Sequence, residues 1–216
     1  MLSPEHYAQL PSFVLGFHGC DQALADTVIS QEVLSLDPSQ NDYDWLGSGA
    51  YFWENNYARA MEWATDMVGK ERGPNKHVIR SPAVIGAIID LGNCLNFLDQ
   101  TAIRLAKECH TLFAKECKIL RKKMPKNVNP KKMAGSRDRI YRRLDRAVVE
   151  EIHKLVALSQ GMENPEDRML DFDTVRSVFL EGEKIYPNAG FLEKTHIQIC
   201  VRNPKCILGY FHPRVD

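Results

Sequence analysis

The sequence has no long hydrophobic run and no leader pattern. No stretch of its 216 residues approaches the roughly 18 consecutive apolar residues that cross a bilayer. The first residues also lack a basic segment followed by an apolar one, which is the pattern of a secretory signal. These absences argue against a transmembrane helix, and they predict a cytoplasmic protein with no membrane partner.

Paired cysteines are missing as well. The six cysteines are scattered and form no CxxC pair, which disfavours both a disulfide framework and a zinc site. Cys109, His110 and Cys117 suggest a metal site, but two thiols eight residues apart on a predicted helix do not converge well on one ion. We therefore expect no metal, and we interpret these cysteines as buried or incidental thiols.

The chain has no net charge, but its charges are unevenly distributed. The 28 Lys and Arg balance the 28 Asp and Glu. Between Arg104 and Arg146, however, fifteen Lys or Arg stand against four Asp or Glu. Such a segment is typical of a surface for nucleic acid or another polyanion, and equally of a solvated helical face balanced by acidic neighbours. The sequence leaves both interpretations open.

Repeats, low-complexity tracts and the Gly-rich phosphate loops of Rossmann and P-loop proteins are also absent. With 44% hydrophobic and 26% charged residues, the composition is that of an ordinary globular protein. At this length the whole chain, residues 1–216, is expected to form a single domain.

Apolar periodicity predicts strands and helices in alternation along most of the chain. The strands are expected near residues 13–19, 50–53, 84–91, 172–180, 196–202 and 206–211. The helices are expected near 21–35, with Asp21 as N-cap, and near 57–68, 99–123 and 137–159. The last two helices flank a connector rich in Pro, Asn and Lys, so we interpret residues 98–170 as a basic helical insertion. The core would comprise about 11–97 and 171–214.

Three short segments place a polar or aromatic side chain where a strand meets a loop, which is where functional sites form. They are Phe17-His18-Gly19-Cys20, Gly47-Ser48-Gly49-Ala50-Tyr51-Phe52 and Gln198-Ile199-Cys200-Val201. Each has a plain structural interpretation when it is taken singly. A histidine beside apolar residues is usually structural, and a tyrosine in a strand usually packs.

In combination and in this order, the segments resemble the three motifs of the ADP-ribosyltransferase superfamily, in its poly(ADP-ribose) polymerase and diphtheria-toxin-like branch. Those motifs are a His-Gly pair, a Gly-x-Gly-x-Tyr-Phe strand start and an apolar strand headed by Glu. The resemblance implies an α+β fold with a split antiparallel β-sheet and flanking helices. It implies NAD as a substrate, and a catalytic set of His18, Tyr51 and Gln198.

The resemblance also implies how NAD is held. Tyr51 would stack on one face of the nicotinamide and Trp63 on the other, since aromatic rings bind such a plane well; packing of Trp63 in the core is an equal alternative. The backbone of Gly19 would bind the carboxamide, because a residue without Cβ lets a ligand approach closely. His18 would hydrogen-bond a ribose hydroxyl.

Gln198 departs from the family pattern, which has a glutamate there. Its amide can orient a ribose hydroxyl but brings no negative charge to an oxocarbenium-like transition state. The departure disfavours polymer formation. It favours mono-ADP-ribosylation, NAD hydrolysis, or a catalytically idle module that binds NAD or ADP-ribose. The carboxylates of Glu181, Glu183 and Glu193 could supply the missing charge or activate the acceptor, or could simply be solvated.

The acceptor of ADP-ribose is not identified by the sequence and could be protein, RNA or DNA. The basic segment is one candidate for guiding it, with Lys122, Lys123, Lys131 and Lys132 as its most concentrated charges. Compact members of the superfamily include bacterial toxins and phage-defence effectors. The resemblance therefore implies a toxin-like role and an antitoxin as a further partner to test.

Overall fold

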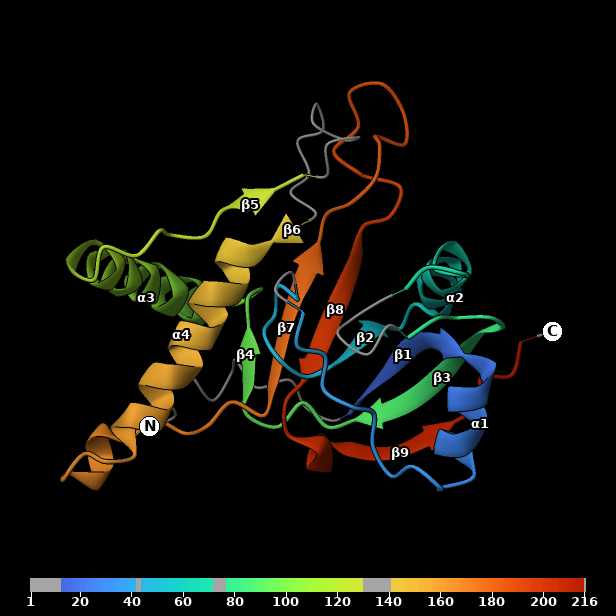
Figure 1. Ribbon diagram of the computed structural model, residues 1–216, viewed down its shortest axis with the longest axis horizontal. Coiled ribbons are helices and arrows are strands. Elements are labelled where there is room, and N and C mark those ends of the chain that lie inside the picture. Colours follow the sequence, from blue (N-terminus) through green and yellow to red (C-terminus); the bar gives the residue numbers. More distant parts are fainter. Residues whose placement is uncertain (1–12, 42–43, 72–76, 130–140, 216) are drawn as a thin grey trace, which may run out of the picture.

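The computed structural model describes residues 13–41, 44–71, 77–129 and 141–215. It has an α+β fold, in agreement with the predicted class, with four α-helices in the described residues around a seven-stranded sheet (Figure 1). The helices are α1 (Gln22–Ile29), α2 (Tyr57–Asp66), α3 (Gln100–Ile119) and α4 (Arg143–Ser159).

The sheet is mixed but mostly antiparallel, in the order β4-β7-β8-β2-β1-β3-β9. Its strands are β1 (Val14–Asp21), β2 (Ala50–Glu54), β3 (Pro82–Ile89), β4 (Cys94–Asn96), β7 (Thr174–Phe179), β8 (His196–Val201) and β9 (Ile207–Phe211). The short strands β5 (Asn127–Val128) and β6 (Tyr141–Arg142) form a separate pair. Short 3-10 helices lie at Pro165–Asp167 and Pro204–Cys206. The expected antiparallel pairing holds for the other neighbours in this sheet, and only β4 departs from it, since it runs parallel to β7.

The middle of the sheet has a short junction between β1 and β2. These two strands pair at only two positions, Gly16 with Glu54 and Phe17 with Trp53. In contrast, β1 pairs with β3 over all eight of its residues. The sheet is therefore narrowly joined between a four-stranded part, β4-β7-β8-β2, and a three-stranded part, β1-β3-β9.

Helices cover both faces of the sheet. Residues directly opposite each other in neighbouring strands share a face, and the face that includes Trp53 and Cys200 packs against α2 and α4. We call it the α2/α4 face. Phe52 and Ile199 point to the other face, where they form a core cluster with α1 through Val28.

Helix α1 differs from the sequence expectation at its C-terminal end. Asp21 caps α1 as predicted, its Oδ1 accepting from the backbone N of Ala23 over 3.1 Å. The helix nevertheless ends at Ile29 and does not reach residue 35, and Gln31 has a φ of 63° that no α-helix tolerates.

The predicted insertion contains α3 and α4, which pack against each other and against the sheet (Figure 1). The apolar side of α4, which includes Val149, Ile152 and Val156, forms one core cluster with Leu95 and Val175 of the sheet. This segment therefore supplies part of the hydrophobic core. No helix in the described ranges is both long and apolar enough to cross a membrane.

Candidate functional site

A cleft of about 300 Å³ opens where the sheet is narrowly joined. Its walls come from α2, from the loop before β2, from β2 and β8 on the α2/α4 face, and from the segment that leads into α4. The lining includes four residues singled out from the sequence: His18, Tyr51, Trp63 and Gln198. Three segments far apart in the chain thus contribute to one cavity, whose size is within the usual range of small-molecule sites.

The opening begins at Gly19 and Tyr51. The register that pairs Phe17 with Trp53 would place Gly19 opposite Tyr51, but the strands are no longer paired there. Instead, Nδ1 of His18 lies 2.8 Å from the backbone oxygen of Tyr51. Because a carbonyl oxygen only accepts, Nδ1 carries the proton and donates it. His18 is thereby held across the gap between the two strands.

Gly19 directs its backbone N–H and C=O toward this gap. On the β2 side of β1, the backbone N of Asn55 donates to the oxygen of Leu15 over 2.9 Å. On the β3 side, the N of Gln22 donates to the oxygen of Ser81 over 2.8 Å. The backbone N–H and C=O groups of successive residues point alternately to the two neighbouring strands. As those of Leu15 point to β2, the backbone groups of the other odd-numbered residues of β1 do so too. A donor and an acceptor of Gly19 therefore lie at the edge of the opening.

Gly19 is not itself among the cleft-lining residues, and its lack of a side chain has a packing reason. A Cβ at this position would lie 2.4 Å from the backbone oxygen of Ala60 and 3.1 Å from Cε3 of Trp63. Glycine thus allows α2 to approach β1, which also brings Trp63 to the cleft. Trp63 packs on Trp53, with ring centroids 5.4 Å apart. Backbone contact of Gly19 with a ligand stays a prediction.

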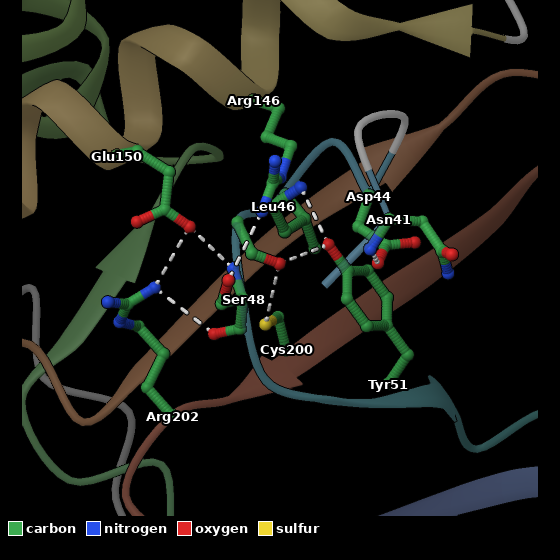
Figure 2. A network of polar contacts seen from close by, with 10 residues as sticks. Asn41, Asp44, Leu46, Ser48, Tyr51, Arg146, Glu150, Cys200 and Arg202 are labelled. Carbon is green, nitrogen blue, oxygen red and sulfur yellow. Dashed lines mark hydrogen bonds and ion pairs between the residues drawn. The ribbon is translucent and has the colours of Figure 1, made fainter. Parts of the chain in front are cut away.

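The hydroxyl of Tyr51 is fixed by the loop of residues 44–49, which we call the Trp45 loop. It donates to the oxygen of Gly47 over 2.8 Å and accepts from the backbone N of Leu46 over 3.0 Å (Figure 2). Burial raises the pKa of this phenol well above its ordinary value, so the hydroxyl stays protonated. Gly47 has a φ of 87°, a conformation that favours glycine. Tyr51 therefore presents its ring from a rigid position.

The Trp45 loop is in turn held by α4. Oε1 of Glu150 accepts from the backbone N of Ser48 over 2.6 Å and lies 3.4 Å from Nη1 of Arg202, which also donates to the oxygen of Ser48 (Figure 2). Burial raises the pKa of the Glu150 carboxyl, but the Ser48 N–H and the Arg202 guanidinium outweigh it and hold the pKa below its ordinary value. An ionised carboxylate from the predicted insertion thus orders a wall of the cleft.

Replacing Glu150 with alanine should loosen this loop. We expect Glu150→Ala to lower the free energy of unfolding by about 1–3 kcal/mol, because charge-assisted hydrogen bonds to the loop are lost. Glu150→Gln should recover part of this loss, since its amide oxygen can still accept from Ser48. Urea denaturation measures both, with Glu116→Ala on the exposed side of α3 as the matched control. Equal stability of Glu150→Ala and the control would contradict the role of Glu150.

The amide of Gln198 is oriented by Trp45. Nε1 of Trp45 donates to Oε1 of Gln198 over 2.6 Å. An indole N–H can only donate, so the amide oxygen must face Trp45. Within the described ranges Trp45 is the one hydrogen-bond partner of this side chain. The two N–H donors of Gln198 therefore point away from Trp45, and one of the two lone pairs on its oxygen is used by Trp45.

Sequence reasoning missed several polar groups of the cleft. His196, Trp53 and Arg59 line it and are each more than nine-tenths buried. The alternation of the strand that carries Gln198 could have pointed to His196, because residues two apart share a face. Trp45 gave no such signal, since it meets Gln198 across 153 positions of sequence.

The three glutamates considered above fall into two groups. Glu181 lines the cleft, and its Oε2 lies 2.8 Å from Nη2 of Arg59. Glu183 and Glu193 are exposed and do not line the cleft.

The segment entering α4 also contributes to the cleft. Tyr141 lines it, and the guanidinium carbon of Arg142 lies 4.6 Å from the ring centroid of Trp45 and 4.0 Å from that of Phe179. At these distances the cation interacts with the ring faces.

Cys109 and Cys117, the thiols weighed above as metal ligands, are both buried. In the part of the chain that the structure describes, no three His, Cys, Asp or Glu side chains gather as metal ligands would.

The chain is 30% identical over 207 residues to the uncharacterized protein MJ0359 of Methanocaldococcus jannaschii. The alignment covers 88% of this chain and 83% of the relative. The two proteins belong to one family. No family model matches the chain, and no solved structure matches it. Because the name of the relative states no activity, the function of the MJ0359 family has to be argued from the cleft.

Proposed function

We propose that the protein cleaves the nicotinamide–ribose bond of NAD and transfers ADP-ribose to a protein or nucleic-acid acceptor. The observation that supports this most strongly is the meeting of His18, Tyr51, Trp63 and Gln198 around one cleft, at the narrow junction of the sheet. His18, Tyr51 and Gln198 belong to the three motifs that resemble ADP-ribosyltransferases, and Trp63 lies on the helix that follows the second motif. The proposal includes the finer fold, a split sheet of the ADP-ribosyltransferase kind.

The residues present fit the polar and flat parts of NAD. The backbone N–H and C=O of Gly19 match the acceptor and donor on the carboxamide edge. The ring of Tyr51, held by its fixed hydroxyl, and that of Trp63 suit the nicotinamide plane. Four buried nitrogens on cleft-lining side chains have no hydrogen-bond partner among the described residues: Trp53 Nε1, Arg59 Nε and Nη1, and His196 Nε2. Of these, Arg59 Nη1 has an ion-pair partner in Glu62, 3.3 Å away. A buried polar atom without a partner is costly, so a polar ligand is expected there.

Gln198 favours transfer of a single ADP-ribose unit or hydrolysis. Its donor amide can bond a ribose oxygen and fix the sugar, but it cannot withdraw a proton from a hydroxyl. The same feature supports the alternative of an idle module that binds NAD or ADP-ribose without turnover. NAD glycohydrolysis is the remaining alternative, and only the products distinguish it from transfer.

One assay separates these functions. The protein is incubated with NAD labelled in its adenylate part, and protein, DNA and RNA are offered separately. We expect release of nicotinamide and label on one of the macromolecules. Free ADP-ribose alone would select hydrolysis, and binding of NAD without turnover would select the idle module. Absence of both binding and turnover would refute the proposal.

The same assay tests the basic segment as a guide for a nucleic-acid acceptor. Lys122 and Lys123 are exposed after α3, while Lys131 and Lys132 lie outside the described residues. Replacing all four with glutamine should reduce labelling of nucleic acid and leave nicotinamide release intact, because these cations would act only by attracting the polyanion. Unchanged labelling would remove this role.

A further inference from the structure

His196 stands out among the buried polar groups of the cleft. Its side chain lies on β8 two residues before Gln198 and therefore on the same face of the sheet, at a spacing of about 7 Å. It is 5% exposed and packs between aromatic rings, with centroids 5.4 Å from Phe179 and 6.0 Å from Trp53. Neither the resemblance nor the triad gives it a role.

The tautomer of His196 follows from its backbone contact. Nδ1 lies 2.6 Å from the oxygen of Lys194. A carbonyl cannot donate, so Nδ1 carries the proton and Nε2 of the neutral ring is an acceptor. Nε2 is buried and has no partner in the part of the chain that the structure describes. A basic nitrogen therefore lies beside Gln198, fixed in orientation through the other nitrogen.

Burial, above all, keeps the ring of His196 neutral, and the neighbouring charged groups modify its pKa. Burial lowers the pKa of His196; the carbonyl of Lys194 opposes this, and Arg59 lowers the pKa further. Glu181 raises the pKa of His196, and Arg142 lowers it. The base form therefore dominates near pH 7.

Two donors accompany this acceptor. Nε1 of Trp53 and Nε of Arg59 are buried and lack partners among the described residues, and both side chains line the cleft with His196. In the register of the sheet Trp53 lies directly opposite Gln198. One acceptor and two donors match a hydroxyl group, which gives its hydrogen to the first and its lone pairs to the others.

We propose that His196, Trp53 and Arg59 form the subsite of the second reactant, a hydroxyl group, and that Nε2 of His196 takes its proton. The inference rests on the proposed function. The bond between C1′ of the ribose and the nicotinamide nitrogen breaks, and neutral nicotinamide leaves with the electron pair. A bond forms between C1′ and the hydroxyl oxygen, and the hydroxyl proton moves to Nε2. The imidazolium then releases it to solvent. A general base of this kind contributes about 100-fold or more to such a step.

The inference selects a class of acceptor. A carboxylate needs no base to react, and it would leave the acceptor nitrogen of His196 without a hydrogen to bond. A hydroxyl, whether of a side chain, a sugar or water, needs a base to take its proton, and it brings a hydrogen for the acceptor nitrogen of His196 to bind. The subsite therefore predicts O-linked ADP-ribose on a hydroxyl group.

The test uses the full chain with NAD in buffer that contains methanol as a simple hydroxyl probe. Wild type should form methyl ADP-ribose as well as ADP-ribose. His196→Gln should lower kcat/KM for both products by about 100-fold, with the Kd of NAD changed by less than about threefold. The decline of kcat/KM at low pH, where His196 becomes protonated, should disappear. Exposed His212→Gln is the matched control and should behave as wild type.

Two further measurements do not depend on turnover: one checks the protonation of His196, and the other checks that the variant is folded. The Cε1 proton of His196 should titrate below the range of an exposed histidine in the protein without NAD. Thermal unfolding should show that His196→Gln is folded. If His196→Gln keeps the wild-type rate and pH profile, the inference is overturned while the proposed function stands. Wild type that neither binds nor consumes NAD would overturn both.

Discussion

Replacing His18 with alanine should lower kcat/KM for NAD by about 100-fold while the protein stays folded. The side chain bridges the gap at which β1 and β2 separate, through the 2.8 Å bond from Nδ1 to the oxygen of Tyr51. Alanine removes both this bond and the distal nitrogen that the proposed function assigns to a ribose hydroxyl. The loss to folding is about 1 kcal/mol, the contribution of one ordinary hydrogen bond. His18→Ala should therefore weaken NAD binding more than it lowers the free energy of unfolding.

A second substitution separates the two nitrogens of His18. In His18→Asn, the amide N–H can replace Nδ1 as the donor to Tyr51, but nothing replaces Nε2. We expect this variant to recover most of the stability and little of the activity. The comparison uses NAD turnover, NAD binding and urea denaturation, with exposed His212→Ala as the matched control. Parallel losses of stability and activity in both His18 variants would show that His18 acts only on the fold.

The sequence was sufficient for most of the secondary structure. The apolar runs that became β1, β3, β8 and β9, and the N-cap at Asp21, depend on local pattern alone. Strand β4 was not predicted, because its three residues, Cys94–Asn96, are too few to show a periodicity. Its parallel pairing with β7 depends on tertiary contacts. The helices α3 and α4 were expected, but no local pattern shows which surface a helix covers.

Only part of the candidate site could likewise be predicted from local sequence. Short motifs pointed to His18, Tyr51 and Gln198, and these side chains do line one cleft. The partners that orient them come from elsewhere: Trp45 holds Gln198 from 153 positions away, and Glu150 holds the Trp45 loop from α4. Such contacts result from the packing of α4 on the sheet, which composition and periodicity do not encode.

A buried ion pair joins β2 and β7 across the intervening β8. The guanidinium of Arg176 contacts both carboxylate oxygens of Glu54, with Nε 2.5 Å from Oε2 and Nη2 2.7 Å from Oε1. Both side chains are 10% exposed. This bidentate geometry is the strongest form of such a contact, and the carboxylate raises the pKa of Arg176 still further. Neither charge has access to enough water to be stable alone.

Arg176→Met should therefore lower the free energy of unfolding by about 3–5 kcal/mol, because it leaves the carboxylate of Glu54 buried without its partner. Adding Glu54→Leu to this variant should restore much of the loss, since an apolar pair of similar volume carries no desolvation cost. The matched control is Lys154→Met, which breaks the pairs of the half-exposed Lys154 with Glu116 and with Glu151 and should cost less than about 1 kcal/mol. Urea denaturation measures all three. If Arg176→Met costs no more than the control, the pair at β2 and β7 is not desolvated in solution.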